Sequence, residues 1–382
     1  MRILHIVPAL GYGGVETYVI RLSRALVELG HEVAILTEGG PLEPLLEGSG
    51  VEVIRASLRQ EGPDGICSRL EGKRFDILNA HNYLAGRIGH VVSLRIDTPY
   101  VLTVHGPRAL AKRVLVRYWS RRVIALSEAD KRGICGPFGL SPGRVRVSFY
   151  PVDVERYRPR AAAGETPAVP EEGGTSALRE CGETSAPLIV HVSRFSNRKA
   201  KVALALLKAL PTVVAKVPGA RLLIVGTGPW FERIAAEATR LNEHLGPVAH
   251  VEGPRLELSD LFNAASVVVA TATTAMEAMA CGAPLIAAGR TGYAGLMDRA
   301  NFARGLDLLF ADHGRCPRPV SAGALREDLL RVLGDRDGCR AEAARLAGRM
   351  AAEFTPRRAA ESVLAIYDDV LAGDVSCGDS RR

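Results

Sequence analysis

Short runs of apolar residues alternate with amphipathic segments along the first part of the chain. Apolar side chains recur every three or four positions from Glu16 to Leu29, which predicts a helix, and Gly30 ends it. The short apolar runs predict strands at Ile3–Val7, Glu32–Thr37, Val51–Ile54, Ile77–Ala80, Tyr100–Val104, Arg122–Leu126 and Val145–Ser148. Strands that alternate with helices form βαβ units, so this part of the chain predicts a parallel sheet.

The same alternation restarts at Leu188, after a segment of different composition. Residues 161–187 are rich in Gly, Pro, Ala, Glu and Thr, which is typical of a linker. Beyond it we expect strands Leu188–Val192, Leu222–Val225, Val267–Ala270 and Leu285–Ala288, and helices Val202–Val214, Trp230–Leu241 and Ala275–Ala280. The sequence therefore predicts two α/β domains, residues 1–158 and 188–355, joined by a linker over residues 159–187.

A last helix is predicted over residues 356–372. Thr355 suits the N-cap position, and Pro356 suits the first helical position. The helix carries an apolar stripe made of Ala360, Val363, Leu364, Tyr367 and Val370. Such a stripe must be buried, so we expect this helix to dock on one of the two domains.

The composition is consistent with this architecture. Apolar residues make up 47% of the 382 residues, whereas aromatic residues make up only 5%. The cores must therefore be built from Ala, Val, Leu and Ile, as in parallel sheets covered by helices.

The cysteines and the chain's start indicate a cytoplasmic protein. Seven cysteines are scattered without a CxxC pair, which favours neither a disulfide framework nor a zinc site. The apolar run after Met1 is too short for a signal peptide, and no stretch is long enough to span a membrane. Peripheral attachment to the inner face of the membrane is the alternative that this pattern leaves open.

The net charge of +7 is unevenly distributed. The segment Arg108–Arg122 holds six basic residues and no acidic one, interleaved with Leu115, Tyr118 and Trp119. One interpretation is a solvated helix face, and another is a surface that meets anionic lipid or an anionic acceptor. No nucleic-acid-binding motif accompanies the charge, so nucleic acid is not predicted as a partner.

Glycines follow the first predicted strand. Gly11-Tyr12-Gly13-Gly14 precedes a helix, where backbone N–H groups can bind an anion. The pattern is similar to a dinucleotide-binding loop, and Glu38 even occupies the place of the ribose-binding acid. However, Glu16 stands where GxGxxG requires a glycine, and the loop is longer than a dinucleotide turn.

Two cations follow the first strand of the second domain. Arg194 and Lys199 are placed at the carboxyl end of a parallel strand, which is where such sheets bind ligands. They suit a diphosphate, whose charge grows as its bond to a sugar breaks, although surface cations in a loop are the simpler interpretation. Gly226 and Gly228, after the next strand, predict a second turn that a ligand can approach closely.

A third candidate site begins the helix after strand Val267–Ala270. Amides around Thr273 and Thr274 can receive a phosphate. Glu277 is expected in the first turn of this helix, where it can accept hydrogen bonds from ribose hydroxyls. The alternative is that this glutamate merely complements the helix dipole.

Six segments, in order along the chain, resemble the family 4 retaining glycosyltransferases. These are MRILHIVPALGYGGVETYVIRLSRALVELGHEVAIL, VIALSEADKRGI, PVDVERYRP, VSRFSNRK, LLIVGTGP and EAMACGAPLIA. The resemblance runs from residue 1 to about residue 371. It implies the GT-B fold, with two facing Rossmann-like domains and a C-terminal helix crossing back to the N-terminal domain. It also implies a metal-independent hexosyl transfer with retention, from a nucleotide-diphosphate sugar to an acceptor.

The resemblance also implies roles for individual residues. Gly13 and Gly14 would lie against the diphosphate or the acceptor, and His105 would face the donor sugar. Arg194 and Lys199 would bind the diphosphate, whereas the ribose would be bound by Glu277. No cofactor is expected apart from the nucleotide sugar as substrate, and the motifs do not distinguish a UDP-, GDP- or ADP-sugar. The acceptor is a glycan, a lipid-linked molecule or a small molecule.

The chain departs from the family pattern at several positions. Tyr150-Pro151 replaces the usual Asn-Gly, Ser193 replaces a glycine before Arg194, and Ala200 replaces the glycine after the lysine. Many members carry a hexose-contacting Glu eight residues before the helix Glu, and Val269 occupies that position here. The polar groups left on the sugar side are the hydroxyls of Thr271, Thr273 and Thr274.

The histidines divide into structural and functional candidates. His5, His31, His191 and His250 lie in or beside predicted strands or turns, and we expect them to be structural. His81 is open to either interpretation, and His105 is the candidate for the active site. No HxxH motif or carboxylate pair has metal-ligand spacing, so no catalytic metal is predicted.

Two alternatives to a glycosyltransferase stay open. A sugar-nucleotide epimerase can share this fold but requires acid/base carboxylates near the sugar, which the sequence does not reveal. A catalytically degenerate GT-B partner subunit would explain the lost Glu and glycines. Hydrolysis of a nucleotide sugar distinguishes an enzyme from such a subunit.

Overall fold

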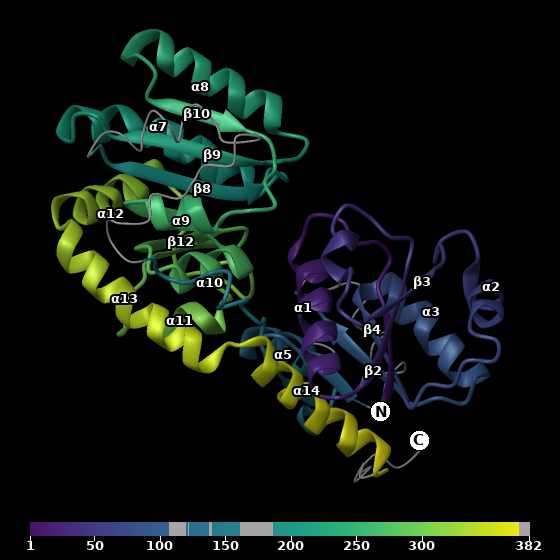
Figure 1. Cartoon of the computed structure of the whole chain (residues 1–382). Helices are drawn as coiled ribbons and strands as arrows, with labels where there is room; N and C mark the ends of the chain where they lie inside the picture. The colour runs from purple at the N-terminus through teal and green to yellow at the C-terminus, as the bar shows by residue number, and fades with distance from the viewer. Residues whose placement is uncertain (107–119, 121, 137–139, 161–185, 374–382) are drawn as a thin grey trace. The chain divides into compact units, whose positions relative to one another are not determined.

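A computed structural model describes residues 1–106, 120, 122–136, 140–160 and 186–373. The chain forms two compact units, each built on its own sheet (Figure 1). Residues 1–151 and 354–382 make up the first unit, and residues 152–353 the second. The basic segment Arg108–Arg122 lies outside the described residues except for Ser120 and Arg122, and the predicted linker does so over residues 161–185.

The first unit contains a parallel sheet in the order β3-β2-β1-β4-β5-β6-β7. Its strands are β1 (Arg2–Ile6), β2 (Glu32–Thr37), β3 (Glu52–Arg55), β4 (Ile77–His81), β5 (Tyr100–Val104), β6 (Arg122–Ala125) and β7 (Val145–Val147). Its described helices are α1 (Gly14–Glu28), α2 (Gly62–Arg69), α3 (Asn82–Arg95), α5 (Glu128–Cys135) and α14 (Pro356–Leu371). The alternation of apolar runs therefore predicted this sheet correctly.

The second unit contains a sheet in the order β10-β9-β8-β11-β12-β13. Its strands are β8 (Leu188–Arg194), β9 (Arg221–Thr227), β10 (Ala249–Glu252), β11 (Val267–Ala270), β12 (Leu285–Gly289) and β13 (Gly292–Leu296). All pairs are parallel except β12 with β13. Its helices are α7 (Ala200–Lys216), α8 (Phe231–Leu245), α9 (Ser259–Ala264), α10 (Ala272–Ala280), α11 (Phe302–Asp307), α12 (Ala322–Gly334) and α13 (Arg336–Glu353).

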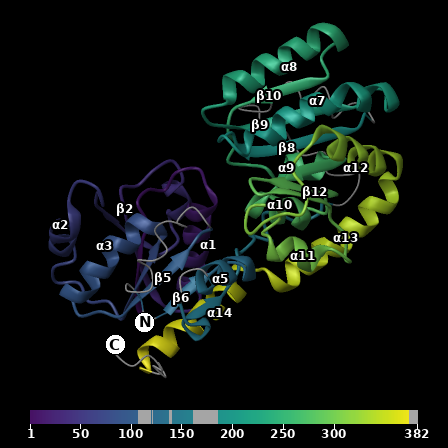
Figure 2. The same ribbon diagram turned by 180° about the vertical axis from the view of Figure 1, so that it is seen from behind.

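Helices form layers over the second sheet. Helix α7 lies between α8 and α12, and the three helices lie side by side in Figure 2. Their apolar faces meet the sheet in one core, to which Ile189, Leu206, Ile224 and Leu329 contribute buried side chains. Helix α10 packs between α9 and α13 in a separate layer. The core contains mainly aliphatic side chains, as the composition predicted.

The C-terminal helix α14 belongs to the first unit, although the chain leaves that unit before β8. It packs against α1, and the two helices lie together in Figure 1. The Asn79 amide on β4 donates a hydrogen bond of 2.7 Å to the Tyr367 hydroxyl. The Thr355 hydroxyl accepts a hydrogen bond of 3.2 Å from the Arg358 N–H, so the predicted N-cap is confirmed.

The boundary between the units lies at Pro151 rather than at the predicted residue 158. The reason is that the segment after Pro151 packs on the second unit. The Tyr157 ring contacts that of Phe262, and the Arg156 guanidinium donates a hydrogen bond of 2.6 Å to the Leu256 carbonyl. Among the described helices, none has the length and apolarity required to cross a bilayer.

Candidate functional site

The glycine loop of the first unit leads from β1 into α1. Gly13 is the N-cap of α1, with an extended backbone, and Gly14 is the first helical residue. The Thr17 hydroxyl donates a hydrogen bond of 2.6 Å to the Gly13 carbonyl, which closes the first turn. Before the glycines, the Leu10 N–H donates a hydrogen bond to the Gly39 carbonyl, and the Leu10 carbonyl accepts one from the Leu42 N–H. These two bonds anchor the loop to the segment after β2. The N–H groups of Gly13 and Gly14 thus lie at the carboxyl edge of the sheet, where an anion can bind.

Three histidines at the carboxyl edge of this sheet form a continuous hydrogen-bonded chain. His5 Nδ1 on β1 lies 2.9 Å from His81 Nε2 on β4, and His81 Nδ1 lies 3.1 Å from His105 Nε2. His105 follows β5, and its Nδ1 lies 3.1 Å from the Tyr150 hydroxyl. The Tyr18 ring packs against this chain, with its centroid 5.0 Å from that of His105.

His5, the first histidine of this hydrogen-bonded row, determines which ring nitrogen carries the proton in all three. His5 Nε2 is completely buried and has no hydrogen-bond partner among the described residues. A buried N–H without an acceptor is rarer than a bare lone pair, so the proton resides on Nδ1 of His5. His5 Nδ1–H then donates to His81, and His81 Nδ1–H donates to His105. The last donor, His105 Nδ1–H, donates to the Tyr150 oxygen.

His5 and His81, which are completely buried, are neutral near pH 7. Burial lowers the pKa of His5 to about 3. Burial, together with His5 and His105, lowers the pKa of His81 well below its usual range. The sequence alone does not connect these histidines. The signal that connects them is that they lie at the carboxyl ends of three strands that are adjacent in the sheet.

This arrangement limits what His105 can contact. Both of its ring nitrogens lie at hydrogen-bond distance from protein groups, namely His81 and Tyr150. A donor sugar could use a ring nitrogen of His105 only by displacing one of these partners. The role of His105 opposite the donor sugar stays a prediction, and its observed contacts connect it to the buried histidines.

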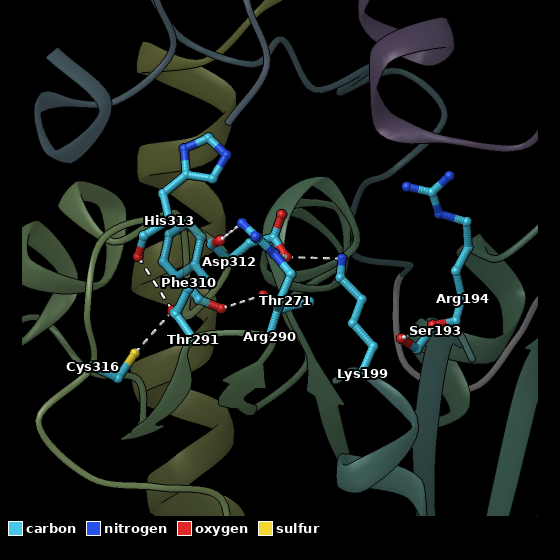
Figure 3. A network of polar contacts seen from close by, with 10 residues as sticks. All are labelled: Ser193, Arg194, Lys199, Thr271, Arg290, Thr291, Phe310, Asp312, His313 and Cys316. Carbon is cyan, nitrogen blue, oxygen red and sulfur yellow. Dashed lines mark hydrogen bonds and ion pairs between the residues drawn. The ribbon is translucent and has the colours of Figure 1, made fainter. Parts of the chain in front are cut away.

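In the second unit, Arg194 is the last residue of β8. Its side chain is exposed at the carboxyl edge of the sheet, and its guanidinium has no polar partner among the described residues. Figure 3 shows Arg194 and Lys199 pointing to the same side of the sheet, with no interaction drawn to the Arg194 guanidinium. A positive charge without a protein counterion at this edge can receive an anionic ligand.

Lys199 lies directly before α7 and already has a partner. Its Nζ lies 2.9 Å from Oδ1 of Asp312, and Nε of Arg290 lies 3.6 Å from the same oxygen (Figure 3). Burial opposes ionisation of Asp312, but Lys199, His313 and Arg290 outweigh it and lower the pKa of this carboxyl to about 2. Lys199 therefore already forms an ion pair within the protein, and a ligand that binds it would share it with Asp312.

Arg290 and Asp312 were not among the residues predicted for this site. Arg290 directly follows β12, so the rule that placed Arg194 at the carboxyl edge could have found it. Asp312 follows no strand, and its contact with Lys199 depends on the path of a loop. The predicted pair, Arg194 and Lys199, is thus joined by Arg290 and Asp312. Lys199 and Arg290 both contact the Asp312 carboxylate.

Gly226 and Gly228 are explained by the chain's own backbone. A Cβ on Gly226 would lie 1.9 Å from the Ser193 carbonyl oxygen, and one on Gly228 would lie 2.9 Å from that of Phe195. Their φ values of 154° and 143° also disfavour side chains. Both glycines therefore let β9 approach the end of β8, which carries Arg194. Their contact with a ligand stays a prediction.

The third candidate site differs from its prediction. Helix α10 begins at Ala272, so Glu277 is not in its first turn. The helix starts early because the Leu309 carbonyl accepts a hydrogen bond of 3.2 Å from the Ala272 N–H. Thr273 and Thr274 occupy the first turn and are half-buried, whereas Glu277 is only 5% exposed.

Of the three threonine hydroxyls expected on the sugar side, that of Thr271 is already engaged within the protein. The Thr271 hydroxyl donates a hydrogen bond of 2.6 Å to the Phe310 carbonyl. Val269 is completely buried within β11, as expected from its position in an apolar run. A carboxylate does lie beside one of the residues predicted to bind the diphosphate, because Asp312 contacts Lys199.

Two family models match the chain in tandem. Glycosyltransferase Family 4 matches residues 12–156, and Glycosyl transferases group 1 matches residues 186–314. The chain belongs to the family 4, group 1 glycosyltransferases. The second match contains Arg194, Lys199, Glu277, Arg290 and Asp312. The resemblance found in the sequence is therefore confirmed, and the protein is an enzyme of the glycosyltransferase class.

Named relatives and solved structures agree with this assignment. This glycosyltransferase is 25% identical over 416 residues to a D-inositol 3-phosphate glycosyltransferase of Kineococcus radiotolerans, covering 93% of this chain and 90% of the relative. Anabaena HepE in complex with UDP and glucose superposes with a TM-score of 0.74 at 19% identity, covering 97% of this chain and 100% of HepE.

The fold is shared with one further enzyme class. A putative UDP-N-acetylglucosamine 2-epimerase from Listeria monocytogenes matches with a TM-score of 0.64 at 13% identity, over 100% of this glycosyltransferase and 99% of that chain. At such identities the structural matches establish the fold alone. The predicted GT-B fold class, with two Rossmann-like domains, is thereby confirmed.

Proposed function

We propose that this glycosyltransferase transfers a hexosyl group from a nucleotide-diphosphate sugar, with retention of anomeric configuration. The observation that supports this most directly is the exposed Arg194, which has no counterion among the described residues and lies at the same sheet edge as Lys199 and Arg290. A diphosphate suits this edge because it carries two charges and can contact several cations. The UDP complex of HepE, which has the same fold, supports a nucleotide ligand.

The proposed donor would contact three groups within the second unit. Its diphosphate would lie on Arg194 and Lys199, and one phosphate would also receive the N–H groups around Thr273 and Thr274 at the start of α10. Glu277 would accept hydrogen bonds from the ribose. Gly13 and Gly14 would bind the diphosphate or the acceptor on the first unit. The nucleotide sugar is then a substrate, and no resident cofactor is required.

These contacts favour the transition state. As the bond between the anomeric carbon and the phosphate oxygen breaks, its electron pair and negative charge pass to the diphosphate. The acceptor hydroxyl oxygen forms the new glycosidic bond to the anomeric carbon, and its proton passes to the departing diphosphate oxygen. Arg194 and Lys199 would stabilise the growing charge, because β8 fixes the backbone of Arg194 and the ion pair with Asp312 positions Lys199 before the reaction.

The acceptor is proposed more broadly, as a glycan, a lipid-linked molecule or a small molecule. Eight curated relatives carry the name D-inositol 3-phosphate glycosyltransferase, so a phosphorylated polyol is the first small molecule to test. The basic segment Arg108–Arg122 supports an anionic acceptor or membrane, and we propose it as the surface that meets one of them.

The epimerase alternative is less compatible with the site. An epimerase requires a carboxylic acid that can exchange protons near neutral pH. The carboxylate nearest to Lys199 is that of Asp312, and its pKa of about 2 keeps it ionised.

A donor screen tests the proposal. The protein is incubated with UDP-, GDP- and ADP-hexoses, with and without a phosphorylated polyol, and release of the nucleoside diphosphate is measured. We expect one donor to be consumed, and NMR of the product should show the anomeric configuration of the donor. Inverted product would contradict retention. Absence of hydrolysis and transfer with every donor would favour a degenerate partner subunit.

A further inference from the structure

One of the two cations predicted for a diphosphate, Lys199, already holds a carboxylate of the protein itself. Asp312 Oδ1 lies 2.9 Å from Lys199 Nζ and 3.6 Å from Arg290 Nε. The three side chains are each only 16 or 17% exposed, so this ion pair is screened by water far less than a surface pair. An anionic ligand that reaches Lys199 therefore encounters a negative charge already in place.

The backbone that presents Asp312 is strained. Leu309, Phe310 and Ala311, which directly precede it, have φ values of 42°, 48° and 71°. Three successive side-chain-bearing residues in the left-handed region are unfavourable, and such a run persists only when its surroundings enforce it.

The surroundings enforce this path through three hydrogen bonds. The Leu309 carbonyl accepts from the Ala272 N–H at 3.2 Å, and the Phe310 carbonyl accepts from the Thr271 hydroxyl at 2.6 Å. The Ala311 carbonyl accepts from the Thr291 N–H at 3.1 Å. The segment is thus anchored to the start of α10 and to the turn after β12, the two elements that border the predicted phosphate site.

The charges near Lys199 decide what this carboxylate does. Lys199, Arg290 and Arg194 supply three positive charges at one edge of the sheet, and Asp312 neutralises one of them. A diphosphate bound there would be attracted by the cations and repelled by Asp312. Because the pKa of Asp312 is about 2, protonation does not relieve this repulsion near neutral pH.

We propose that Asp312 is a resident counter-anion of the diphosphate site, which weakens binding of the nucleoside diphosphate and so promotes release of the product. The proposal rests on the proposed function, because it presumes that the diphosphate binds at Arg194 and Lys199. It makes a prediction of definite sign. Removing the charge of Asp312 should tighten binding of the product, whereas a carboxylate that only positions Lys199 would weaken it when removed.

The test is calorimetric titration of UDP, GDP and ADP into the wild-type protein and the Asp312→Asn variant, using the nucleotide that the wild type binds most tightly. We expect the dissociation constant to fall by about tenfold in the variant, because one unit charge acts at short range in a poorly solvated site. The difference should shrink as salt is raised from low to high concentration. A merely structural effect would not depend on salt in this way.

A matched control is Glu237→Gln. Glu237 lies on α8 and pairs with Arg240, and among the described residues it has no contact with Lys199, so the variant removes the same charge from the same unit without altering the Lys199 ion pair. Its affinity for the nucleotide should equal that of the wild type. Thermal unfolding verifies that each variant folds, and Asp312→Ser replaces Asp312→Asn if the latter does not.

The outcomes separate this proposal from the proposed function. Tighter binding in the Asp312 variant supports the counter-anion. Unchanged or weaker binding overturns it, while leaving the donor site intact if Arg194→Ala abolishes binding. If the wild type binds none of the three nucleotides, the proposed function fails and the counter-anion fails with it. Loss of affinity for the nucleotide sugar alone would instead identify Asp312 as a sugar contact and overturn the counter-anion.

Discussion

Lowering the pH should destabilise the first unit through its buried histidines. Burial lowers the pKa of His5 to about 3, from the ordinary value of 6.5, and that of His81 also falls well below 6.5. A group whose pKa is depressed by folding contributes stability above its unfolded pKa and loses it as the pH falls. The loss should therefore begin near pH 6.5 and continue, for His5, to about pH 3.

The magnitude follows from proton linkage. At pH 5 the unfolded chain binds a proton at His5 and the folded protein does not, so the free energy of unfolding falls by about 2 kcal/mol relative to its value well above pH 6.5. His81 is also completely buried and its pKa is lowered well below the ordinary value, so its protonation on unfolding should add to this loss. The loss from His5 alone is a large part of the stability of an ordinary domain.

Urea denaturation at pH 7.5 and pH 5, followed by circular dichroism, measures this loss. The His5→Asn variant, whose amide can replace the Nδ1–H donor, should lose about 2 kcal/mol less than the wild type between these two pH values. His244→Asn is the matched control, because His244 is exposed on α8 of the other unit. Equal stability of the wild type at both pH values, or the same loss in His5→Asn, would refute the reasoning.

Three further predictions concern single features. Thr355→Ala removes the N-cap of α14 and should cost about 1 kcal/mol in urea denaturation; an unchanged midpoint would show that the cap is unimportant. Gly40→Ala should cost more than about 1 kcal/mol, because its Cβ would lie 2.6 Å from the Leu10 carbonyl oxygen, whereas Gly348→Ala, in open space, should not destabilise; equal effects would contradict this reading. The protein should sediment with anionic vesicles at low salt and less so at high salt; equal sedimentation with neutral vesicles would remove Arg108–Arg122 as a membrane surface.

The sequence predicted the buried parallel strands well because such strands are continuous apolar runs. Strands β10 and β13 were missed for a physical reason. Strand β10 is an edge strand whose four residues include His250 and Glu252, and β13 begins with Gly292 and contains Gly295. Neither presents the apolar run that a central strand requires, so only pairing with a neighbour reveals it.

The candidate site was predicted in part. Arg194 could be placed from sequence because it follows a clear strand. The partner of Lys199 could not, because Asp312 reaches it through left-handed residues that no local propensity favours. The chain of His5, His81 and His105 depends on strand order, which places β4 beside β1 and not beside β3.

The central claim is that Arg194 and Lys199 bind the diphosphate of the donor. The most direct test is steady-state turnover of the preferred nucleotide sugar by Arg194→Ala and Lys199→Ala. Lys208→Ala, on an exposed position of α7, serves as the control. Each site variant should fold normally and turn over about a hundredfold more slowly or worse, as for other preorganised electrostatic contacts. Near-normal turnover in both variants would contradict the placement of the donor at this edge of the sheet.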